Sequence, residues 1–412
     1  MSTASDIAGA PGAAGLRRRL DALRTDRSIV EEACRIRADA GSSEVFAGLI
    51  WNLVTEPGDG VAGALVAALG VEGALDCAFG SGSATTEADP LADDPRASAR
   101  ALREGRKRWG ERLDPGFLLI SLRAAVRTGS RLLLPADPEW PEMLADLGDH
   151  APLALWLRGD PAALNAPGVA IVGARAASSY GEHVAGELAG DLAQEGRVIV
   201  SGGAYGIDGA AHRAALRAGG ITVAVLAGGI DRAYPAGHAQ LFERIVAHGA
   251  VVSEVPCGGA PTRWRFLERN RVIGALAAAT VVVEAGWRSG SLNTAGHAAT
   301  LGRPLGAVPG PVTSAASAGC HRLLREYDAR CITSAADVRE LLGATTEQIT
   351  PPGEDPDMLR LADALSTRAP RDSADLARRS GLSRDRVEAL LGILELDGSA
   401  VRTATGWRSI AV

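Results

Sequence analysis

Apolar and polar positions follow three successive patterns along this chain of 412 residues. Residues 16–134 place apolar side chains at helical spacing between glycine breaks, which predicts a helical N-terminal domain. Inside this domain, residues 81–97 are polar and rich in turn formers, which predicts a loop. Residues 1–15 are rich in Ala, Gly and Ser, and we expect them to be a disordered tail.

A different pattern covers residues 135–342, which we expect to form the core domain together with an approach segment. Six short apolar runs, the first at 169–174 and the last at 304–310, alternate with helical segments. Buried strands separated by helices are typical of a parallel sheet covered on both faces. The pattern predicts the α/β class, with a Rossmann-like, doubly wound parallel sheet.

The C-terminal part has its own pattern. Residues 343–356 contain Pro351, Pro352 and Pro356, which predicts a linker. Residues 357–412 show three helical segments followed by an alternating ribbon, which is the order of a winged helix domain.

Charge locates the most promising segment for an anionic partner. The whole chain carries a net charge of −6, yet residues 169–342 hold 16 basic and 14 acidic residues. Nearly every basic residue is arginine, since Lys107 is the only lysine. No apolar run approaches the roughly 20 residues of a bilayer span and no secretory signal is seen. We therefore expect a cytoplasmic protein without a membrane segment.

Glycine and small polar residues gather where predicted strands end. In a doubly wound fold, ligands bind at the carboxyl ends of the strands. Glycines let backbone N–H groups approach an oxygen closely, and a helix N-terminus favours an anion. Tight turns alone would be the simpler explanation for one loop, but three such loops predict a phosphate-binding groove. The candidate residues are Gly173, Arg175, Ser201, Gly202, Gly203, Ala204, Ser289, Gly290 and Ser291.

Familiar cofactor motifs are absent from the sequence. The loop after the first strand lacks GxGxxG, and no GxxxxGK[ST] occurs anywhere. The histidines are scattered, and the five cysteines lack CxxC spacing, which argues against a metal site. We predict no cofactor and no metal.

The segment 263–271 contains four arginines, one glutamate and two aromatic residues. Arginine grips phosphate through a planar fork and stacks on bases, and an aromatic ring stacks on unpaired bases. The segment therefore favours nucleic-acid binding, although a solvated helix start with its two rings in the core would look similar. Its candidate contacts are Arg263, Arg265, Phe266, Arg269, Asn270 and Arg271.

Carboxylates near the strand ends leave room for an enzyme. Asp208, Asp231, Glu254 and Glu284 include candidates for a general base. We favour structural roles, in which Asp208 caps the following helix while Glu254 and Glu284 orient arginines.

The ordered motifs SGGAYGIDGAAHRAAL, FLERNRVIGALA and VVVEAGWRSGSLNTAGHAATLGRPLGAVPG resemble the DNA-processing protein A family, also called DprA or Smf. The resemblance covers roughly residues 135–342. It implies a homodimer that binds single-stranded DNA, loads RecA during natural transformation and helps displace single-strand-binding protein, without catalytic turnover. Its motifs place the DNA groove at Gly173, Arg175, Ser201–Ala204, Phe266, Arg269–Arg271 and Ser289–Ser291.

Two departures from the family pattern stand out. Gly203 replaces the usual apolar residue of SGLAxGID, and Gly319–Tyr327 replaces the usual GTNxLIxxGA. The winged domain is also nearly neutral, whereas a duplex reader is normally basic. We expect that domain to contact protein or to bind DNA weakly.

The leading hypothesis is a non-enzymatic single-stranded DNA binder and recombination mediator. One alternative is an enzyme that binds a nucleotide phosphate, such as a phosphoribohydrolase. Another is a transcription regulator built around the winged helix.

Overall fold

The computed structural model describes residues 13–80, 99–343 and 355–410, and the chain divides into two compact units at residues 344 and 345. The predicted loop at 81–97, most of the predicted tail and most of the predicted linker lie outside the described residues. Residues 13–15, which we expected to be disordered, are the first residues of helix α1.

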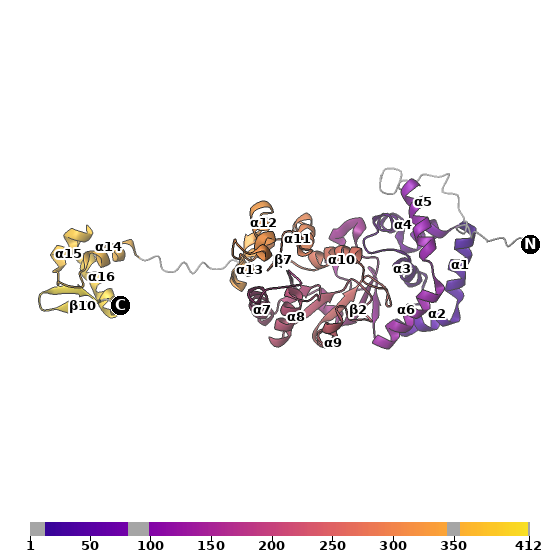
Figure 1. The fold of residues 1–412 in the computed structure, drawn as a ribbon, viewed down its shortest axis with the longest axis horizontal. Helices are drawn as coiled ribbons and strands as arrows, with labels where there is room; N and C mark the ends of the chain where they lie inside the picture. The colour runs from indigo at the N-terminus through magenta and orange to yellow at the C-terminus, as the bar shows by residue number, and fades with distance from the viewer. Residues whose placement is uncertain (1–12, 81–98, 344–354, 411–412) are drawn as a thin grey trace, which may run out of the picture. The chain divides into compact units, whose positions relative to one another are not determined.

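Among the described residues, six helices form the N-terminal part of the larger unit, and Figure 1 shows how they are arranged. Residues 13–36 form two helices instead of one continuous helix, because Asp26 accepts a hydrogen bond from Ile29 N and so begins a new helix. Trp51 and Trp109 meet edge to face, with ring centroids 5.0 Å apart, at the centre of this part. The helices are α1 (Ala13–Thr25), α2 (Arg27–Ile36), α3 (Ser43–Val54), α4 (Gly60–Phe79), α5 (Ala99–Arg112) and α6 (Pro115–Thr128).

Helix α4 is 20 residues long and apolar enough to cross a membrane by length and composition. Our expectation that no apolar segment approaches this length is therefore wrong. However, Gly70 interrupts the helix with a φ of +72°, and Leu65, Leu75 and Phe79 are buried in the helical core. These features are those of a core helix, and a single helix of this kind is weak evidence for a span.

A nine-stranded sheet follows, in the order β1-β2-β6-β5-β4-β3-β7-β8-β9. Seven strands run parallel: the six that were predicted and β9, which was not predicted. At one edge, β1 and β2 pair antiparallel in a stretch that we expected to be a connection. Strand β1 was not predicted because it is three residues long and is surrounded by turn-forming residues. The strands are β1 (Arg131–Leu133), β2 (Leu155–Gly159), β3 (Gly168–Val172), β4 (Val198–Ser201), β5 (Thr222–Val225), β6 (Ala250–Ser253), β7 (Ala279–Val282), β8 (Leu305–Ala307) and β9 (Arg330–Cys331).

Helices cover both faces of the sheet, which confirms the doubly wound prediction. Side chains alternate along β3, so Val169 and Ile171 enter one core while Ala170 and Val172 enter the other. The first core is closed by α7 (Ser179–Gln194), α8 (Ile207–Arg217) and α13 (Ala335–Leu341). The second is closed by α10 (Arg263–Ala275), α11 (Ser291–Thr300) and α12 (Ala318–Glu326). Helix α9 (Ala239–His248) packs against β2, β5 and β6, and its buried side chains belong to a third apolar cluster, which also contains the core of the N-terminal helices.

The order of the strands determines where a ligand can bind. From β3 the chain adds β4, β5 and β6 on one side, and it then returns to place β7 on the other side of β3. The loops leaving β3 and β7 therefore turn in opposite directions, which opens a crevice at their carboxyl ends. The fold places the predicted glycine-rich loops at this crevice.

The C-terminal unit contains three helices and a two-stranded ribbon, which confirms the winged helix. Leu361, Leu376, Val387 and Leu391 form its apolar core. Its elements are α14 (Pro356–Ala364), α15 (Ser373–Ser380), α16 (Arg384–Leu396), β10 (Ala400–Thr403) and β11 (Gly406–Ser409).

Candidate nucleic-acid interface

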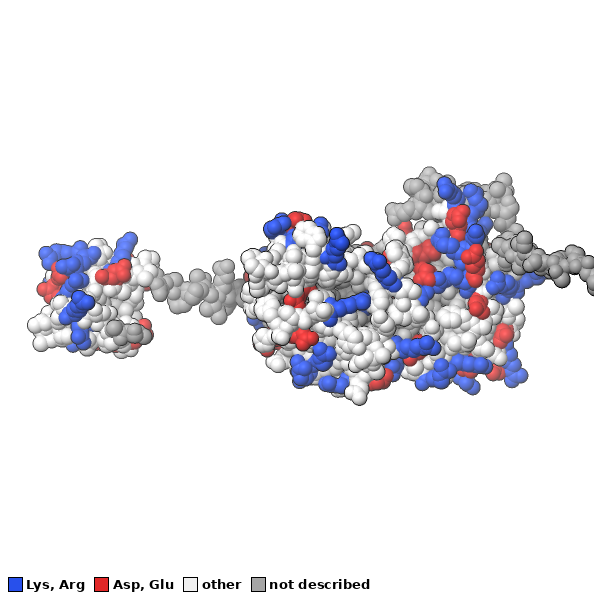
Figure 2. Space-filling model, viewed as in Figure 1, with Lys and Arg blue, Asp and Glu red and all other residues white. Residues whose placement is uncertain are grey.

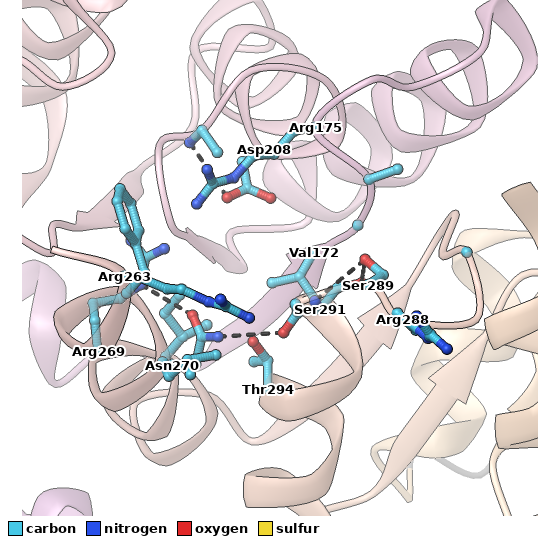
Figure 3. A pocket seen from close by; sticks show the side chains of 18 of the residues that line it. Val172, Arg175, Asp208, Arg263, Arg269, Asn270, Arg288, Ser289, Ser291 and Thr294 are labelled. Carbon is cyan, nitrogen blue, oxygen red and sulfur yellow. Dashed lines mark hydrogen bonds between the residues drawn. The ribbon is translucent and has the colours of Figure 1, made fainter.

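A pocket of about 740 Å³ opens at the crevice between β3 and β7 (Figure 3). Its walls come from the loops after β3, β4 and β7 and from the first turns of α10. Ten of the fifteen predicted site residues line it: Gly173, Arg175, Ala204, Arg263, Phe266, Arg269, Asn270, Ser289, Gly290 and Ser291. The structure thus brings together segments that lie more than a hundred residues apart.

An exposed arginine and a ring form one wall of the pocket. The Arg175 guanidinium lies over the Phe266 ring, with its carbon 4.5 Å from the ring centroid. The Tyr234 ring packs against Phe266 at a centroid distance of 5.5 Å, and half of Tyr234 is exposed. A cation and two aromatic faces are therefore presented side by side to a ligand.

Arg269 is a buried member of the site. Its Nη1 donates to the carbonyl oxygens of Gly202, at 2.7 Å, and Val225, and its Nε donates to Asn270 Oδ1 at 3.2 Å. Burial lowers the pKa of Arg269 to about 10, and the nearby Asp208 carboxylate partly opposes this shift. Burial likewise raises the pKa of Asp208, against the effect of Arg269. Arg269 thus fixes the loops that surround it.

Asn270 connects α10 to the loop after β7. Its Nδ2 donates to the Gly290 carbonyl oxygen at 3.3 Å (Figure 3). The same Nδ2 donates to Asn293 Oδ1 at 3.1 Å. The hydroxyls of Ser289 and Ser291 are hydrogen-bonded to each other at 2.8 Å. This loop is held in one conformation and leads directly into α11, where a helix N-terminus favours an anion.

Two predicted contacts point into the protein instead. Arg265 donates from Nε and Nη2 to the Glu56 carboxylate at 2.8 and 2.9 Å, and Arg271 donates from both Nη atoms to Glu254 at 2.6 Å. Both arginines already hold a carboxylate in a two-pronged pair. Arg265 therefore attaches α10 to the N-terminal helices, and Arg271 attaches it to the end of β6.

The loop after β4 supports the pocket from behind. Ser201 Oγ donates to the Ile171 carbonyl oxygen at 2.7 Å and is fully buried. A Cβ on Gly202 would lie 2.5 Å from Arg269 Nη2, so only glycine allows this close approach. Gly203 has a φ of +67° and packs against Phe242. Ser201, Gly202 and Gly203 do not line the main pocket, although Gly202 lines a smaller one beside it.

The carboxylates have structural partners. Glu254 orients Arg271, as predicted, whereas Glu284 accepts from Ser178 N and Oγ, both at 2.8 Å, and does not orient an arginine as we expected. This bond begins α7 and fixes the loop that carries Arg175. Asp208 does not cap α8 as we expected, because it lies in the first turn of that helix and the N-cap residue is Gly206. Its carboxylate instead accepts from Ala204 N in the loop after β4, at 3.3 Å.

Among the lining residues that were not predicted, Tyr234, Trp287 and Arg288 carry an aromatic ring or a positive charge. Trp287 and Arg288 lie in the loop after β7, directly before Ser289, so the strand-end argument that found Ser289 applies to them equally. Tyr234 lies in the loop after β5, which carries no phosphate-loop pattern, and only its contact with Phe266 reveals it.

Three arginines at the pocket are uncompensated. Within the described parts of the chain, Arg175, Arg263 and Arg288 form no ion pair, although most other arginines do. Figure 2 shows basic side chains spread over this face of the α/β part. No three His, Cys, Asp or Glu side chains among the described residues come together as a metal site would need. The pocket is therefore suited to an organic anion with flat rings.

Two family models match the chain. DNA recombination-mediator protein A matches residues 131–343, and the DprA winged helix domain matches residues 345–406. The DNA processing protein DprA of Mycobacterium tuberculosis is 49% identical over 308 residues, which cover 70% of this chain and 79% of that protein. DprA of Bacillus subtilis is 37% identical over 232 residues, covering 56% and 77% respectively. The X-ray structure of Streptococcus pneumoniae DprA aligns with a TM-score of 0.58 and 31% identity, covering 73% of this chain and 97% of that one.

The Rossmann-like fold, its cationic groove and these matches define the class as DNA-processing proteins that mediate recombination. Within that class, the chain belongs to the DNA-processing protein A family, DprA or Smf, as its motifs implied.

Proposed function

We propose that the groove at the β3 and β7 loops binds single-stranded DNA. The observation that carries this proposal is the group of unpaired arginines, Arg175, Arg263 and Arg288, around exposed aromatic faces. Arginine forks bind phosphates, and rings such as Phe266 and Tyr234 stack on bases that have no pairing partner. A duplex keeps its bases inside the stack, so only a single strand engages both kinds of group.

The contacts inside the protein separate the site residues into those that position the site and those that are free to contact DNA. Arg269, Arg271 and Arg265 position α10 and the loops, whereas Arg175, Arg263 and Phe266 contact the DNA. Ser289–Ser291 form the edge that faces the anion at the start of α11, and Asn270 holds this edge in place. With these roles, each predicted residue of α10 has a function, and DNA can bind without breaking the ion pairs of Arg265 and Arg271.

Family membership supports a wider role for the protein. We propose a cytoplasmic, homodimeric mediator that loads RecA onto incoming strands, assisted by displacement of single-strand-binding protein. We also propose that it acts without catalytic turnover, because Asp208, Glu254 and Glu284 are each held by structural partners.

The two alternative functions receive less support from the site. A phosphoribohydrolase needs a carboxylate free to act on its substrate, and the strand-end carboxylates described above are engaged. A duplex-reading regulator needs a basic recognition helix. Helix α16 instead exposes Ile393, Glu395 and Leu396 beyond its first turn.

Fluorescence anisotropy across a salt series tests this proposal with labelled single-stranded and double-stranded oligonucleotides. Because each phosphate contact on a single strand contributes about −0.7 to the slope of log K against log salt, three free arginines predict about −2. We expect tighter binding to single strands than to duplexes of the same sequence. Equal binding to both, or affinity independent of salt, would overturn the proposal.

A further inference from the structure

A second aromatic group lies at the rim of the groove. Trp287 lines the pocket, yet 56% of this residue is exposed to solvent. It follows β7 in the loop that also carries Arg288. Its indole therefore extends from the pocket towards the neighbouring helix α12.

The fold brings α12 onto this loop through a close backbone contact. Gly319 N donates to the Ala285 carbonyl oxygen at 2.7 Å, and a Cβ on Gly319 would lie 2.8 Å from the oxygens of both Ala285 and Gly286. Glycine is needed for this approach. One turn further along α12, the Arg322 guanidinium then lies over the Trp287 ring, 5.4 Å from its centroid.

Arg322 also lies over a second ring, that of Tyr327, at 5.5 Å. Its Nε donates to Glu326 Oε2 at 2.8 Å and its Nη2 donates to Tyr327 Oη at 3.3 Å. Arg325 pairs with the same Glu326 at 3.3 Å. Two arginines thus share one carboxylate, and this turn of α12 keeps a positive charge beside two partly exposed rings.

We propose that Trp287, Arg322 and Tyr327 form a second binding site, for an unpaired nucleotide of a strand that leaves the main groove. The inference rests on the proposed function of that groove and extends its DNA path onto α12. The two rings offer stacking faces, and the guanidinium offers a planar fork for phosphate. Arg322 and Tyr327 lie within Gly319–Tyr327, where the sequence departs from the family pattern.

The test compares the binding of single-stranded oligonucleotides of two lengths. A short strand of about 5 nucleotides occupies the groove, whereas one of about 15 nucleotides also reaches α12, within the range of site sizes known for single-strand grooves. We expect Arg322→Ala and Tyr327→Ala to weaken binding of the long strand about tenfold and of the short strand less than about twofold.

Arg325→Ala is the matched control, because Arg325 lies on the same helix as Arg322 and pairs with the same carboxylate, that of Glu326. Substitution of Arg325 should change the affinity for either strand by less than about twofold. Arg322→Lys keeps the charge but loses the planar fork. We therefore expect it to weaken binding of the long strand nearly as much as Arg322→Ala does. Thermal melting of each variant confirms that α12 remains folded.

The outcomes separate the two proposals. If Arg322→Ala and Arg325→Ala weaken the long strand equally, or if Arg322→Lys restores full affinity, the second site is wrong and the groove proposal stands. If the wild type binds neither strand, the groove proposal fails and this inference fails with it.

Discussion

Replacing Glu254 with glutamine is expected to lower the free energy of unfolding by about 3–5 kcal/mol, because the change leaves a buried guanidinium without its counter-charge. The Arg271 side chain is 3% exposed and that of Glu254 is 10% exposed, and both pairing distances are 2.6 Å. Denaturant unfolding of the wild type and of Glu254→Gln measures the difference.

Glu243→Gln provides a matched control. Glu243 pairs with Arg158 in the same two-pronged geometry, at 3.0 and 2.9 Å, but its side chain is 63% exposed. Water screens that pair, so the expected loss is about 0–1 kcal/mol. A Glu254→Gln protein as stable as wild type, with tighter binding of single-stranded DNA, would show that Arg271 is a DNA contact after all.

The double substitution Arg175→Ala with Phe266→Ala should produce the largest loss of DNA affinity. A stacked base contributes about 1–3 kcal/mol and a charge-assisted hydrogen bond about 1.5–3 kcal/mol. Their joint removal predicts a Kd for single-stranded DNA raised on the order of 100-fold to 10,000-fold. Anisotropy titration at fixed salt measures this change.

Trp264 supplies the control for this experiment. It lies on α10 two residues before Phe266 and is 59% exposed, but it does not line the pocket. Trp264→Ala is therefore expected to change the Kd by less than about threefold, since no base stacks there. If Trp264→Ala costs as much affinity as Phe266→Ala, the DNA follows a different face of α10.

Sequence patterns predicted which loops lie together in the structure, because strand-end loops obey a local rule. Each apolar run ends in a recognisable loop, and parallel strands bring their carboxyl ends to one edge. Gly173, Arg175 and Ser289 therefore come together in the structure as expected. The antiparallel strands β1 and β2 were not predicted by this rule, because neither belongs to a strand–helix–strand repeat.

The arginines of α10 show where sequence reasoning stops. Local charge cannot reveal a partner that is distant in the chain, and Glu56 lies 209 residues from the Arg265 it holds. Arg271 likewise meets Glu254 only when β6 and α10 are packed together. Burial decides between a DNA contact and a structural ion pair, and burial depends on the tertiary fold.

Photo-cross-linking tests the central claim most directly. A single-stranded oligonucleotide carrying 5-iododeoxyuridine is bound to the full-length protein and irradiated, and the cross-linked residues are identified by mass spectrometry. The account predicts cross-links at Phe266 and Tyr234 in the groove between β3 and β7, lost when excess unlabelled single strand competes. Cross-links confined to the winged helix or to helices α1–α6 would contradict it.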